Sequence, residues 1–441
     1  MGTNGCDGLC SGVSSADNYV AYAERFYKWY IRGCTERIKS YVMFSKYSIV
    51  QKSRISKILK SVLNNKQITR SQLSEKLRLS PSAISKYTKI LIDLGLLKET
   101  SKTVSKSGRK SVLLELNPEI GLNIAVVLNV SSIQGVLINS IGEILYQSEE
   151  PTYFGVPKDE LLDSLFRLID KLVIEAKKIN RKLFGIGIGI GGYINPDLGI
   201  SHEYLYAKNW YDVPLKNIVE EKYNIPCFLV NDANACALGE KYYGRGIGVD
   251  HFLCVLLGEG VGMGIVVNGE IYMGKVYYAG EFGHTHSISD GQLCFCGHTG
   301  CLETVSSIQY ILSVARKGLS KGVNSEILKH CRNDISKLKI EHMIIAANNG
   351  DRFARNIFEQ VGRYLGEKLA DIANIFNPEL IILRGPTIDG NRFLFETIER
   401  VVMNLSLRAI AKSMKIVYSE DRTDIRFMGI NSLILIDYFS Q

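Results

Sequence analysis

The sequence predicts an α/β body that follows a small, basic, helical domain. From residue 119 onward, apolar strand-like segments alternate with amphipathic helices, which is the pattern of an α/β fold. Residues 51–112 contain fifteen Lys or Arg and three Asp or Glu, a net charge of +12, so the other residues carry −4 of the total of +8. A basic domain beside a mildly acidic body predicts a polyanionic partner for one part of the chain.

Length and composition bound the number of domains and the compartment. A chain of 441 residues should hold two or three domains, and a hydrophobic content of 46% is ample for globular cores. No run of eighteen apolar residues and no signal peptide is evident, so we expect a cytoplasmic protein without a membrane span. Most of the ten cysteines are scattered, as thiols of a reducing compartment usually are.

Residues 1–50 form an N-terminal extension that we expect to be partly disordered and then helical. The first eighteen residues are rich in Gly, Ser, Asn and Cys, which favours disorder. Aromatic residues at helical spacing follow in residues 19–44. This helix is expected to pack on its neighbour or on a partner subunit, and a binding role stays open.

Residues 51–118 have the pattern of a winged helix-turn-helix domain. Thr69 and Gln72 predict a capping box, and Ser80 or Ser82 is placed to cap the next helix, which Gly95 should end. Two short strands around a basic loop then predict the wing. The alternative is a three-helix element with a solvated basic face.

The predicted DNA-contacting residues lie on the second of these helices and on the wing. On the helix they form a donor-rich face able to enter a major groove, and on the wing they would meet phosphates or a minor groove. These residues are Ser82, Ser85, Lys86, Lys89, Lys102, Lys106, Arg109 and Lys110.

Residues 280–303 contain a candidate metal centre. His284, Cys294, Cys296 and Cys301 follow the spacing H-x9-C-x-C-x4-C, and one imidazole with three thiolates suits tetrahedral zinc. Glycines in this stretch let the chain fold tightly enough for the four side chains to converge. The alternatives are a glycine-rich loop with idle thiols and a disulfide.

A second candidate site lies at the end of the strand predicted for residues 228–230. Asn231 and Asp232 follow this strand, and ligands bind at the carboxyl ends of strands in α/β sheets. Both residue types are also good helix N-caps, and the two roles are compatible.

Three stretches resemble the ROK family, which contains sugar kinases and repressors built on the same sugar-binding body. They read Val-Asn-Asp-Ala-Asn-Ala-Cys-Ala-Leu-Gly-Glu from residue 230, Gly-Glu-Phe-Gly-His from residue 280, and Cys-Phe-Cys-Gly-His-Thr-Gly-Cys-Leu-Glu from residue 294. The resemblance implies a two-lobed, actin-like (ribonuclease-H-like) body over residues 119–441. It also implies one structural zinc per chain at the four ligands named above, and sugar contacts from Asn231, Asp232, Glu281, His284 and Glu303.

The resemblance fails where family kinases bind ATP. Asn129 stands where the kinases have an Asp, and Ser131 and Ser132 replace two glycines of the phosphate turn. Glu259 adds a negative charge where phosphate would lie. We therefore expect no ATP and no enzyme activity. Asp232, equivalent to the catalytic base of the kinases, should bind sugar only.

These features together predict a sugar-responsive transcriptional regulator, most simply a repressor of sugar uptake or catabolism genes. Its partners would be double-stranded operator DNA and a sugar or sugar phosphate effector, and the resemblance suggests a homodimer or homotetramer. Two alternatives remain: an ATP-dependent ROK kinase with an accessory DNA-binding domain, and a regulator that answers to a protein partner. The sugar, the operator and the sign of regulation are left open.

Overall fold

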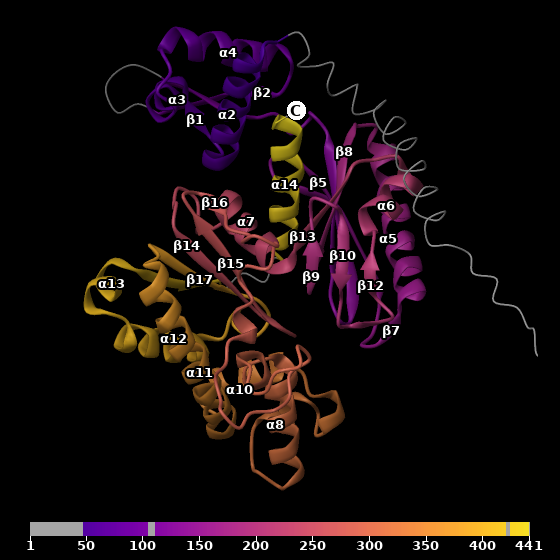
Figure 1. Ribbon diagram of the computed structural model, residues 1–441, viewed down its shortest axis with the longest axis vertical. Coiled ribbons are helices and arrows are strands. Elements are labelled where there is room, and N and C mark those ends of the chain that lie inside the picture. The colour runs from indigo at the N-terminus through magenta and orange to yellow at the C-terminus, as the bar shows by residue number, and fades with distance from the viewer. Residues whose placement is uncertain (1–46, 105–110, 420–423, 441) are drawn as a thin grey trace, which may run out of the picture. The chain divides into compact units, whose positions relative to one another are not determined.

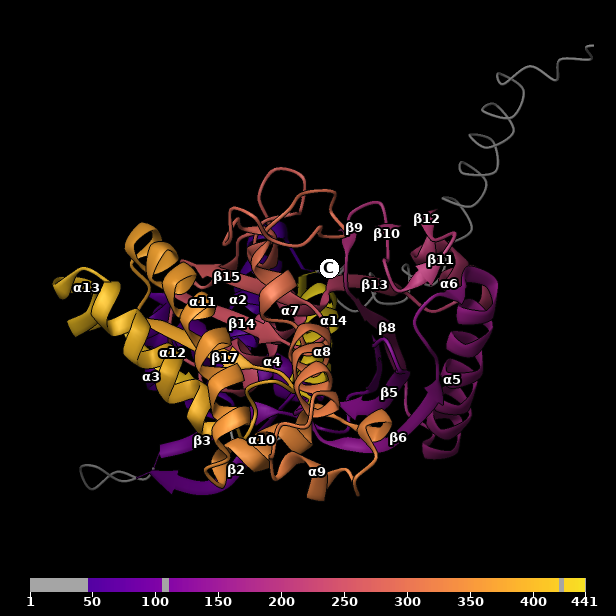
Figure 2. The same ribbon diagram turned by 90° about the horizontal axis from the view of Figure 1, so that it is seen from below.

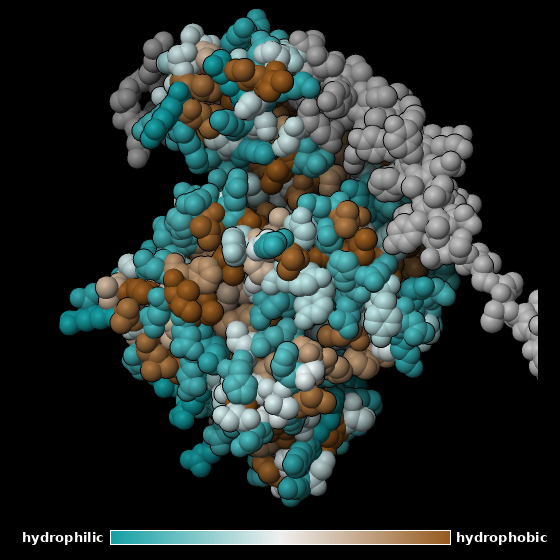
Figure 3. All heavy atoms as spheres, in the orientation of Figure 1, coloured by the Kyte–Doolittle hydropathy of each residue, from teal (hydrophilic) through white to brown (hydrophobic). Residues whose placement is uncertain are grey.

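The computed structural model describes residues 47–104, 111–419 and 424–440, of which residues 55–439 form one compact unit (Figure 1). The helix and the disorder predicted for residues 1–44 lie outside the described residues. None of the helices in the described part of the chain combines the length and apolar character needed to cross a bilayer. On the face drawn in Figure 3, hydrophilic and hydrophobic residues are interspersed.

The first domain is a winged helix. Its elements are α2 (Ile49–Asn65), β1 (Ile68–Thr69), α3 (Arg70–Leu77), α4 (Pro81–Asp93), β2 (Leu97–Val104) and β3 (Ser111–Leu116). The strands form an antiparallel sheet in the order β1-β3-β2, and both long strands flank the predicted wing. Fully buried side chains from the three helices, including Ile58, Leu73 and Ile84, form its core.

The predicted helix boundaries of this domain follow from local chemistry. The Thr69 hydroxyl accepts from the Gln72 N–H at 3.2 Å and the Gln72 side chain accepts from the Thr69 N–H at 2.9 Å, which confirms the capping box. Of the two candidate caps for α4, Ser80 is the N-cap, because its hydroxyl accepts a hydrogen bond from the Ala83 N–H at 3.3 Å. Gly95 follows the helix with φ +71°, a conformation that favours glycine.

The first lobe of the body is a mixed five-stranded sheet in the order β13-β8-β4-β5-β6. Its strands are β4 (Leu122–Leu128), β5 (Ser132–Asn139), β6 (Ile144–Pro151), β8 (Leu183–Ile190) and β13 (Cys227–Asn231). β4, β8 and β13 are parallel, whereas β5 is antiparallel to both of its neighbours. Helix α5 (Lys158–Ile179) covers one face of this sheet (Figure 2), and its buried leucines belong to the same apolar core as the isoleucines of β8.

Short strands and one helix complete this lobe. β7 (Val156–Pro157) pairs with β11 (Ala207–Lys208), and β9 (Tyr193–Asn195), β10 (Ile200–Glu203) and β12 (Tyr211–Val213) form a small antiparallel sheet. Helix α6 (Leu215–Tyr223) precedes β13. The small sheet places the loop after β10 beside the carboxyl ends of β8 and β13, where ligands bind in α/β folds.

The second lobe repeats the strand pattern of the first. Its sheet contains β14 (Phe252–Leu257), β15 (Val261–Val267), β16 (Glu270–Ile271), β17 (Leu380–Arg384) and β18 (Lys415–Tyr418), in the order β16-β15-β14-β17-β18. β14 to β16 form an antiparallel meander, and β17 and β18 add in parallel. This duplicated topology confirms the predicted actin-like, ribonuclease-H-like fold.

The helices of the second lobe follow its meander and pack into its apolar core. They are α8 (Ile308–Ser320), α9 (Ile327–His330), α10 (Ile340–Asn348), α11 (Arg352–Phe376), α12 (Arg392–Leu405) and α13 (Arg408–Ser413). Three short 3₁₀ turns, Phe282–His284, Leu302–Val305 and Ile335–Lys337, lie in the connections. The first two belong to the predicted metal loop.

Helices α7 (Asp232–Tyr243) and α14 (Arg426–Ser440) lie close to glycine-rich strands. A Cβ atom on Gly187 of β8 would lie 2.2 Å from Ile430 of α14, and one on Gly264 of β15 would lie 2.4 Å from Ala237 of α7. The sequence predicts the final helix over residues 431–439, but α14 begins five residues earlier, at Arg426. Gly429 lies within this helix although glycine is a poor helix former. A side chain is not tolerated at this position, because a Cβ atom there would lie 1.8 Å from the Ala235 carbonyl oxygen of α7.

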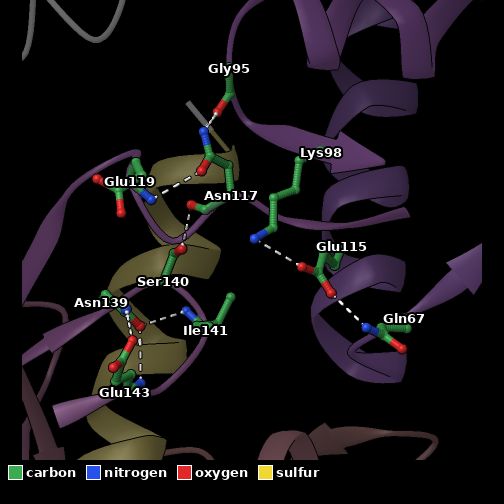
Figure 4. A network of polar contacts seen from close by, with 10 residues as sticks. All are labelled: Gln67, Gly95, Lys98, Glu115, Asn117, Glu119, Asn139, Ser140, Ile141 and Glu143. Carbon is green, nitrogen blue, oxygen red and sulfur yellow. Dashed lines mark hydrogen bonds and ion pairs between the residues drawn. The ribbon is translucent and has the colours of Figure 1, made fainter. Parts of the chain in front are cut away.

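A polar network joins the winged helix to the first lobe (Figure 4). The Asn117 side chain, just after β3, donates to the Gly95 carbonyl at 2.8 Å, and the Asn117 carbonyl accepts from the Ser140 hydroxyl at 2.7 Å. Asn139 shapes the Ser140 loop by accepting from the backbone N–H of Ile141 and Glu143. Ser140 therefore connects the β5–β6 turn to the segment that ends the winged helix.

Candidate functional site

A cavity of about 740 Å³ is lined by residues of both lobes. All five residues predicted to contact sugar, Asn231, Asp232, Glu281, His284 and Glu303, line it. They come from the start of α7 and from the two 3₁₀ turns of the metal loop with their flanking residues. The fold thus brings together side chains that are more than 70 residues apart in the sequence.

Asn231 and Asp232 lie at the carboxyl end of β13, where α7 begins. The Asn231 side chain accepts from the N–H groups of Ala233 and Asn234 and is the N-cap of α7. Asp232 accepts from the Ala233 N–H at 2.8 Å. Burial raises the pKa of Asp232, and the positive charge of Arg426 opposes this rise. Asn231 and Asp232 therefore lie at the start of α7 and line the cavity at the same time.

Three further polar residues, Glu281, His284 and Glu303, line the cavity together with Asp232. Burial raises the pKa of Glu281 to about 7, against the opposing influence of His284, and the charges of Asp232 and Glu303 add to the rise. Burial also raises the pKa of Glu303, whose carboxylate accepts from the Val261 N–H at 2.9 Å. Carboxylates held this way can accept hydrogen bonds from several hydroxyl groups of one small ligand.

The four predicted metal ligands converge. One ligand atom from each of His284, Cys294, Cys296 and Cys301 lies within 4.8 Å of the others. The His284 Nδ1 atom is 3.6 Å from the Cys294 sulfur, and the Cys296 and Cys301 sulfurs are 3.5 Å apart. The three cysteines are free thiols, so the disulfide alternative does not hold. This donor set fits a tetrahedral zinc ion.

His284 faces the thiols and the cavity at once. Its Nδ1 atom lies beside the Cys294 sulfur, whereas its Nε2 atom is 3.7 Å from a Glu281 carboxylate oxygen. A ring bound through Nδ1 would leave Nε2 for an outer partner. The predicted metal loop and the carboxylates that line the cavity are consequently one structural unit.

Sequence reasoning missed an aromatic wall of the cavity. Tyr193, Tyr204 and Tyr206 line it from the β8–β11 region of the first lobe, and the Tyr204 and Tyr206 rings meet edge to face at 5.3 Å. Among the described residues, the buried Tyr204 hydroxyl has no hydrogen-bond partner. The only signal in the sequence is the alternation Tyr-Leu-Tyr at residues 204–206. Aromatic faces beside carboxylates suit a ligand with both C–H and O–H edges.

The residues that the sequence identified as unfavourable for ATP also line the cavity. Asn129, Ser131, Ser132 and Glu259 all line it. In the glycine turn after β14, the Gly258 N–H donates to the Gly260 carbonyl at 3.0 Å and the Val261 N–H donates to Glu303. Burial raises the pKa of Glu259. Two backbone N–H groups of this turn are therefore already used within the protein.

A buried ion pair that the sequence did not reveal also lines the cavity, in contact with Asn129. The Arg426 guanidinium donates to both carboxylate oxygens of Asp424 at 2.6–3.1 Å, and to the Asn129 side-chain oxygen at 2.8 Å. Arg384, the last residue of β17, pairs with Glu240 at 3.4 Å, with 7% and 2% of the two side chains exposed. Arg384, Arg426 and Asp424 line the cavity, and each arginine is paired with a carboxylate of the protein.

The predicted DNA-contacting residues of α4 share its exposed face. Ser82, Ser85, Lys86 and Lys89 are exposed, whereas Ile84, Tyr87, Thr88 and Leu91 are buried on the opposite side. Lys102 lies in β2, and Lys106, Arg109 and Lys110 lie outside the described residues.

A winged helix joined to a duplicated, ribonuclease-H-like body with a carboxylate-lined cavity defines a class of two-domain regulators with a kinase-like ligand site. Residues 123–435 match the ROK family, and residues 54–98 match the winged helix-turn-helix DNA-binding family. The chain belongs to the ROK family. The family predicted from the cysteine and glycine motifs is thereby confirmed.

Curated relatives and solved structures extend this assignment. The xylose repressor of Caldicellulosiruptor bescii is 33% identical over 385 residues, which are 87% of this chain and 95% of that protein. A ROK family transcriptional regulator, a homolog of the Escherichia coli MLC protein, has a TM-score of 0.74 at 28% identity and covers 89% of this chain and 98% of its own. A ROK glucokinase from Streptomyces griseus, solved with glucose and AMPPNP, has a TM-score of 0.64 at 25% identity, covering 71% of this chain and 99% of its own. These relatives agree with the predicted class, a transcriptional regulator that responds to a sugar.

Proposed function

We propose that this chain is a transcriptional repressor that releases its operator DNA when a pentose, D-xylose in the first place, binds in the inter-lobe cavity. The proposal rests on the side chains that line the cavity, which suit a sugar but do not suit a nucleotide phosphate. Asp232, Glu281 and Glu303 line the cavity with acceptors suited to sugar hydroxyls, whereas Asp424, already paired with Arg426, and Glu259 line it with negative charges where a triphosphate would have to be neutralised. The likeness to a xylose repressor over 87% of the chain supports this choice of sugar.

The proposed sugar site works by hydrogen bonding without phosphoryl transfer. Asn231, Asp232, Glu281 and Glu303 would bind sugar hydroxyls, with His284 contributing its second ring nitrogen. Phosphoryl transfer depends on positioning and on neutralising phosphate charge. The carboxyl group of Glu259 would add negative charge beside a phosphate instead of neutralising it. The Gly258 N–H already donates to the Gly260 carbonyl, so it is not available to position a phosphate.

In this proposal residues 51–118 bind DNA and residues 119–441 bind the effector. Ser82, Ser85, Lys86 and Lys89 would enter the major groove, and the wing with Lys102, Lys106, Arg109 and Lys110 would contact the DNA backbone. A homodimer or homotetramer in the cytoplasm would read an operator with two-fold symmetry. Sugar binding must favour the DNA-releasing state for the sugar to act as inducer.

We also propose one structural zinc ion per chain, held by His284, Cys294, Cys296 and Cys301. When bound, the ion would cross-link the loop and leave no open coordination position for chemistry. Glu281 and Glu303 flank the ligands in sequence, so the cross-link would hold both carboxylates at the cavity.

Fluorescence anisotropy on labelled DNA from the chain's own promoter region tests the proposal. D-xylose should lower the DNA affinity at least tenfold in the wild type and leave it unchanged in Asp232→Asn, which should still bind DNA without sugar. Asp371→Asn, which alters an exposed carboxylate on α11, is the matched control. A full response to D-xylose in Asp232→Asn would contradict the proposed site.

The kinase alternative is tested on the same preparations. A coupled ADP-release assay with D-xylose, D-glucose and other common sugars should give no sugar-dependent ADP. Sustained ADP production that Asp232→Asn abolishes would replace the repressor proposal with an enzymatic one.

A further inference from the structure

Two consecutive tyrosines of the second lobe contact the first lobe shortly before Glu281 in the sequence. We infer that they belong to a clasp between the lobes, which positions Glu281 relative to Asn231 so that one ligand can bind both. The clasp consists of Tyr193 and Asp197 from the first lobe and Tyr277 and Tyr278 from the second. Of these four residues only Tyr193 lines the cavity. The inference rests on the proposed sugar site, and it assigns that site residues that hold its ligand-binding groups in place.

Tyr277 has an unusual backbone conformation. Its φ of +70° lies in the left-handed region, where a residue with a bulky side chain persists only if its surroundings hold it there. Its hydroxyl donates a hydrogen bond to Asp197, in the turn between β9 and β10 of the first lobe. That turn is well defined, because the Asn195 side chain accepts from the Leu198 N–H at 3.0 Å. The contact with the first lobe is therefore part of what holds the strained residue.

Tyr278 packs against Tyr193 of β9. The ring centroids are 4.8 Å apart and the ring planes differ by 36°, a geometry within the range of favourable aromatic pairs. Tyr193 directly follows Gly192, whose carbonyl accepts from the Asn231 side chain at 3.3 Å. Gly192 is itself held close to β10, since a Cβ atom on it would lie 2.3 Å from the Glu203 carbonyl oxygen. One hydrogen bond and one aromatic contact thus connect Asn231 with Tyr278.

Glu281 is fixed within the second lobe by the residue before it. The Gly280 carbonyl accepts from the Met263 N–H of β15 at 3.0 Å, and a Cβ atom on Gly280 would lie 1.9 Å from the Met263 carbonyl oxygen. The Ala279 N–H donates to the Met273 carbonyl at 3.2 Å and closes the loop that carries both tyrosines. Because the backbone before Glu281 is bound to β15, its position relative to the first lobe depends on contacts between the lobes. The clasp supplies such contacts three and four residues before Glu281.

The first test needs no sugar. Tyr193→Ala removes the first-lobe half of the aromatic contact, and hydrogen–deuterium exchange is measured for residues 279–285 of the second lobe. Three N–H groups of this segment donate hydrogen bonds within it, so their exchange reports on its order. Exchange should be at least about threefold faster in Tyr193→Ala, the size of effect expected for an aromatic contact, and unchanged in Tyr211→Ala, which removes an exposed tyrosine of the first lobe. Wild-type exchange in Tyr193→Ala would overturn the inference.

The second test measures D-xylose binding by calorimetry. Tyr278→Ala should lower the affinity by about threefold to tenfold, the range that corresponds to an aromatic contact, although Tyr278 does not line the cavity. Tyr278→Phe keeps the ring and should bind within about twofold of the wild type. Tyr272→Ala, which alters a 52% exposed tyrosine just before the same loop, is the matched control. Unchanged affinity in Tyr278→Ala, or equal losses in Tyr278→Ala and Tyr278→Phe, would contradict a clasp built on this ring.

A double-variant cycle with Glu281→Gln separates positioning from a general loss of stability. If Tyr278 acts through Glu281, Tyr278→Ala should cost less than about twofold in D-xylose affinity once Glu281 has been replaced. Fully additive losses would mean that Tyr278 does not act through Glu281, which overturns the inference. If the wild type binds no sugar, the proposed function fails, and the exchange measurement still decides whether the clasp holds the segment of Glu281.

Discussion

Asp389 carries a buried oxygen, Oδ1, that has no hydrogen-bond partner among the described residues. Burial raises the pKa of this carboxyl to about 7; Arg384 opposes the rise, and Asp424 and Glu240 add to it. Because the folded pKa lies above the unfolded value, ionisation of Asp389 costs stability, and the cost grows as the pH rises from about 4 through 7.

Asp389→Asn should therefore stabilise the protein more in alkaline than in acid solution. The gain in unfolding free energy should be larger by about 2 kcal/mol at pH 8 than at pH 4.5, allowing for partial exposure. Urea unfolding at both pH values measures the difference, with Asp371→Asn on the surface of α11 as control. A gain that does not change with pH would contradict the assignment.

At the scale of single residues, the sequence predicted what short motifs encode. Asp232, Glu281 and the candidate metal ligands belong to local patterns. The structure brings Asp232, Glu281 and His284 to one cavity and brings the four candidate ligands together. The contact between Asn129 and Arg426 joins residues that are 297 positions apart, so no local sequence pattern predicts it. Tyr204 and Tyr206 were missed because a short tyrosine alternation is also typical of ordinary strand surface.

Among the elements, α4 yields a direct prediction. Lys86→Ala/Lys89→Ala should weaken operator binding and reduce the slope of log affinity against log salt by about 2, since each lysine would release about one counterion. Lys329→Ala/Lys412→Ala, which removes two exposed positive charges from the second lobe, is the control. Anisotropy titrations at several salt concentrations measure both slopes; equal slopes for the α4 variant and the wild type would reject this helix as the reading element.

The metal loop yields another prediction. Cys301→Ser should remove the zinc ion, lower the unfolding temperature and abolish the sugar response, because the loop carries Glu281 and Glu303. Cys331→Ser, which alters another buried free thiol of the second lobe, should keep one zinc per chain. Elemental analysis and thermal unfolding provide the readouts. Full zinc content in Cys301→Ser would exclude that ligand.

The start of α14 shows why element boundaries escape prediction. The sequence predicts the final helix over residues 431–439, and Gly429, just before that range, has a low helix propensity. The helix instead begins at Arg426, because the glycine allows α14 to approach the backbone of α7. A tertiary contact thus overrides the local preference, and such contacts cannot be deduced from one sequence.

For the whole molecule, alternation of strands and helices predicted an α/β body, and the ROK resemblance supplied the duplicated topology. Neither predicted how the winged helix and the body are connected. Asn117 ends the winged helix and accepts from Ser140 of the β5–β6 turn. The adjacent Asn139 carbonyl accepts from Asn431 of α14, at 3.1 Å, and Asn431 also donates to the Tyr243 hydroxyl at the end of α7. Hydrogen bonds thereby link the helices that begin at Asp232 and Arg426 to the winged helix.

Ser140→Ala tests whether this link carries the sugar signal. Ser140 is 1% exposed, and its substitution removes one of the two donors to the Asn117 carbonyl, which keeps the Ile120 N–H, at a cost of about 0.5–1.5 kcal/mol. Calorimetry should find D-xylose affinity unchanged, and anisotropy should find sugar-free DNA affinity within a few fold of the wild type. The sugar-induced loss of DNA affinity should shrink by 0.5–2 kcal/mol, roughly the effect expected when a coupling contact is removed. Ser432→Ala deletes a hydrogen bond of the same 2.7 Å length inside α14 and controls for stability alone. An undiminished response in Ser140→Ala would place the coupling elsewhere in the body.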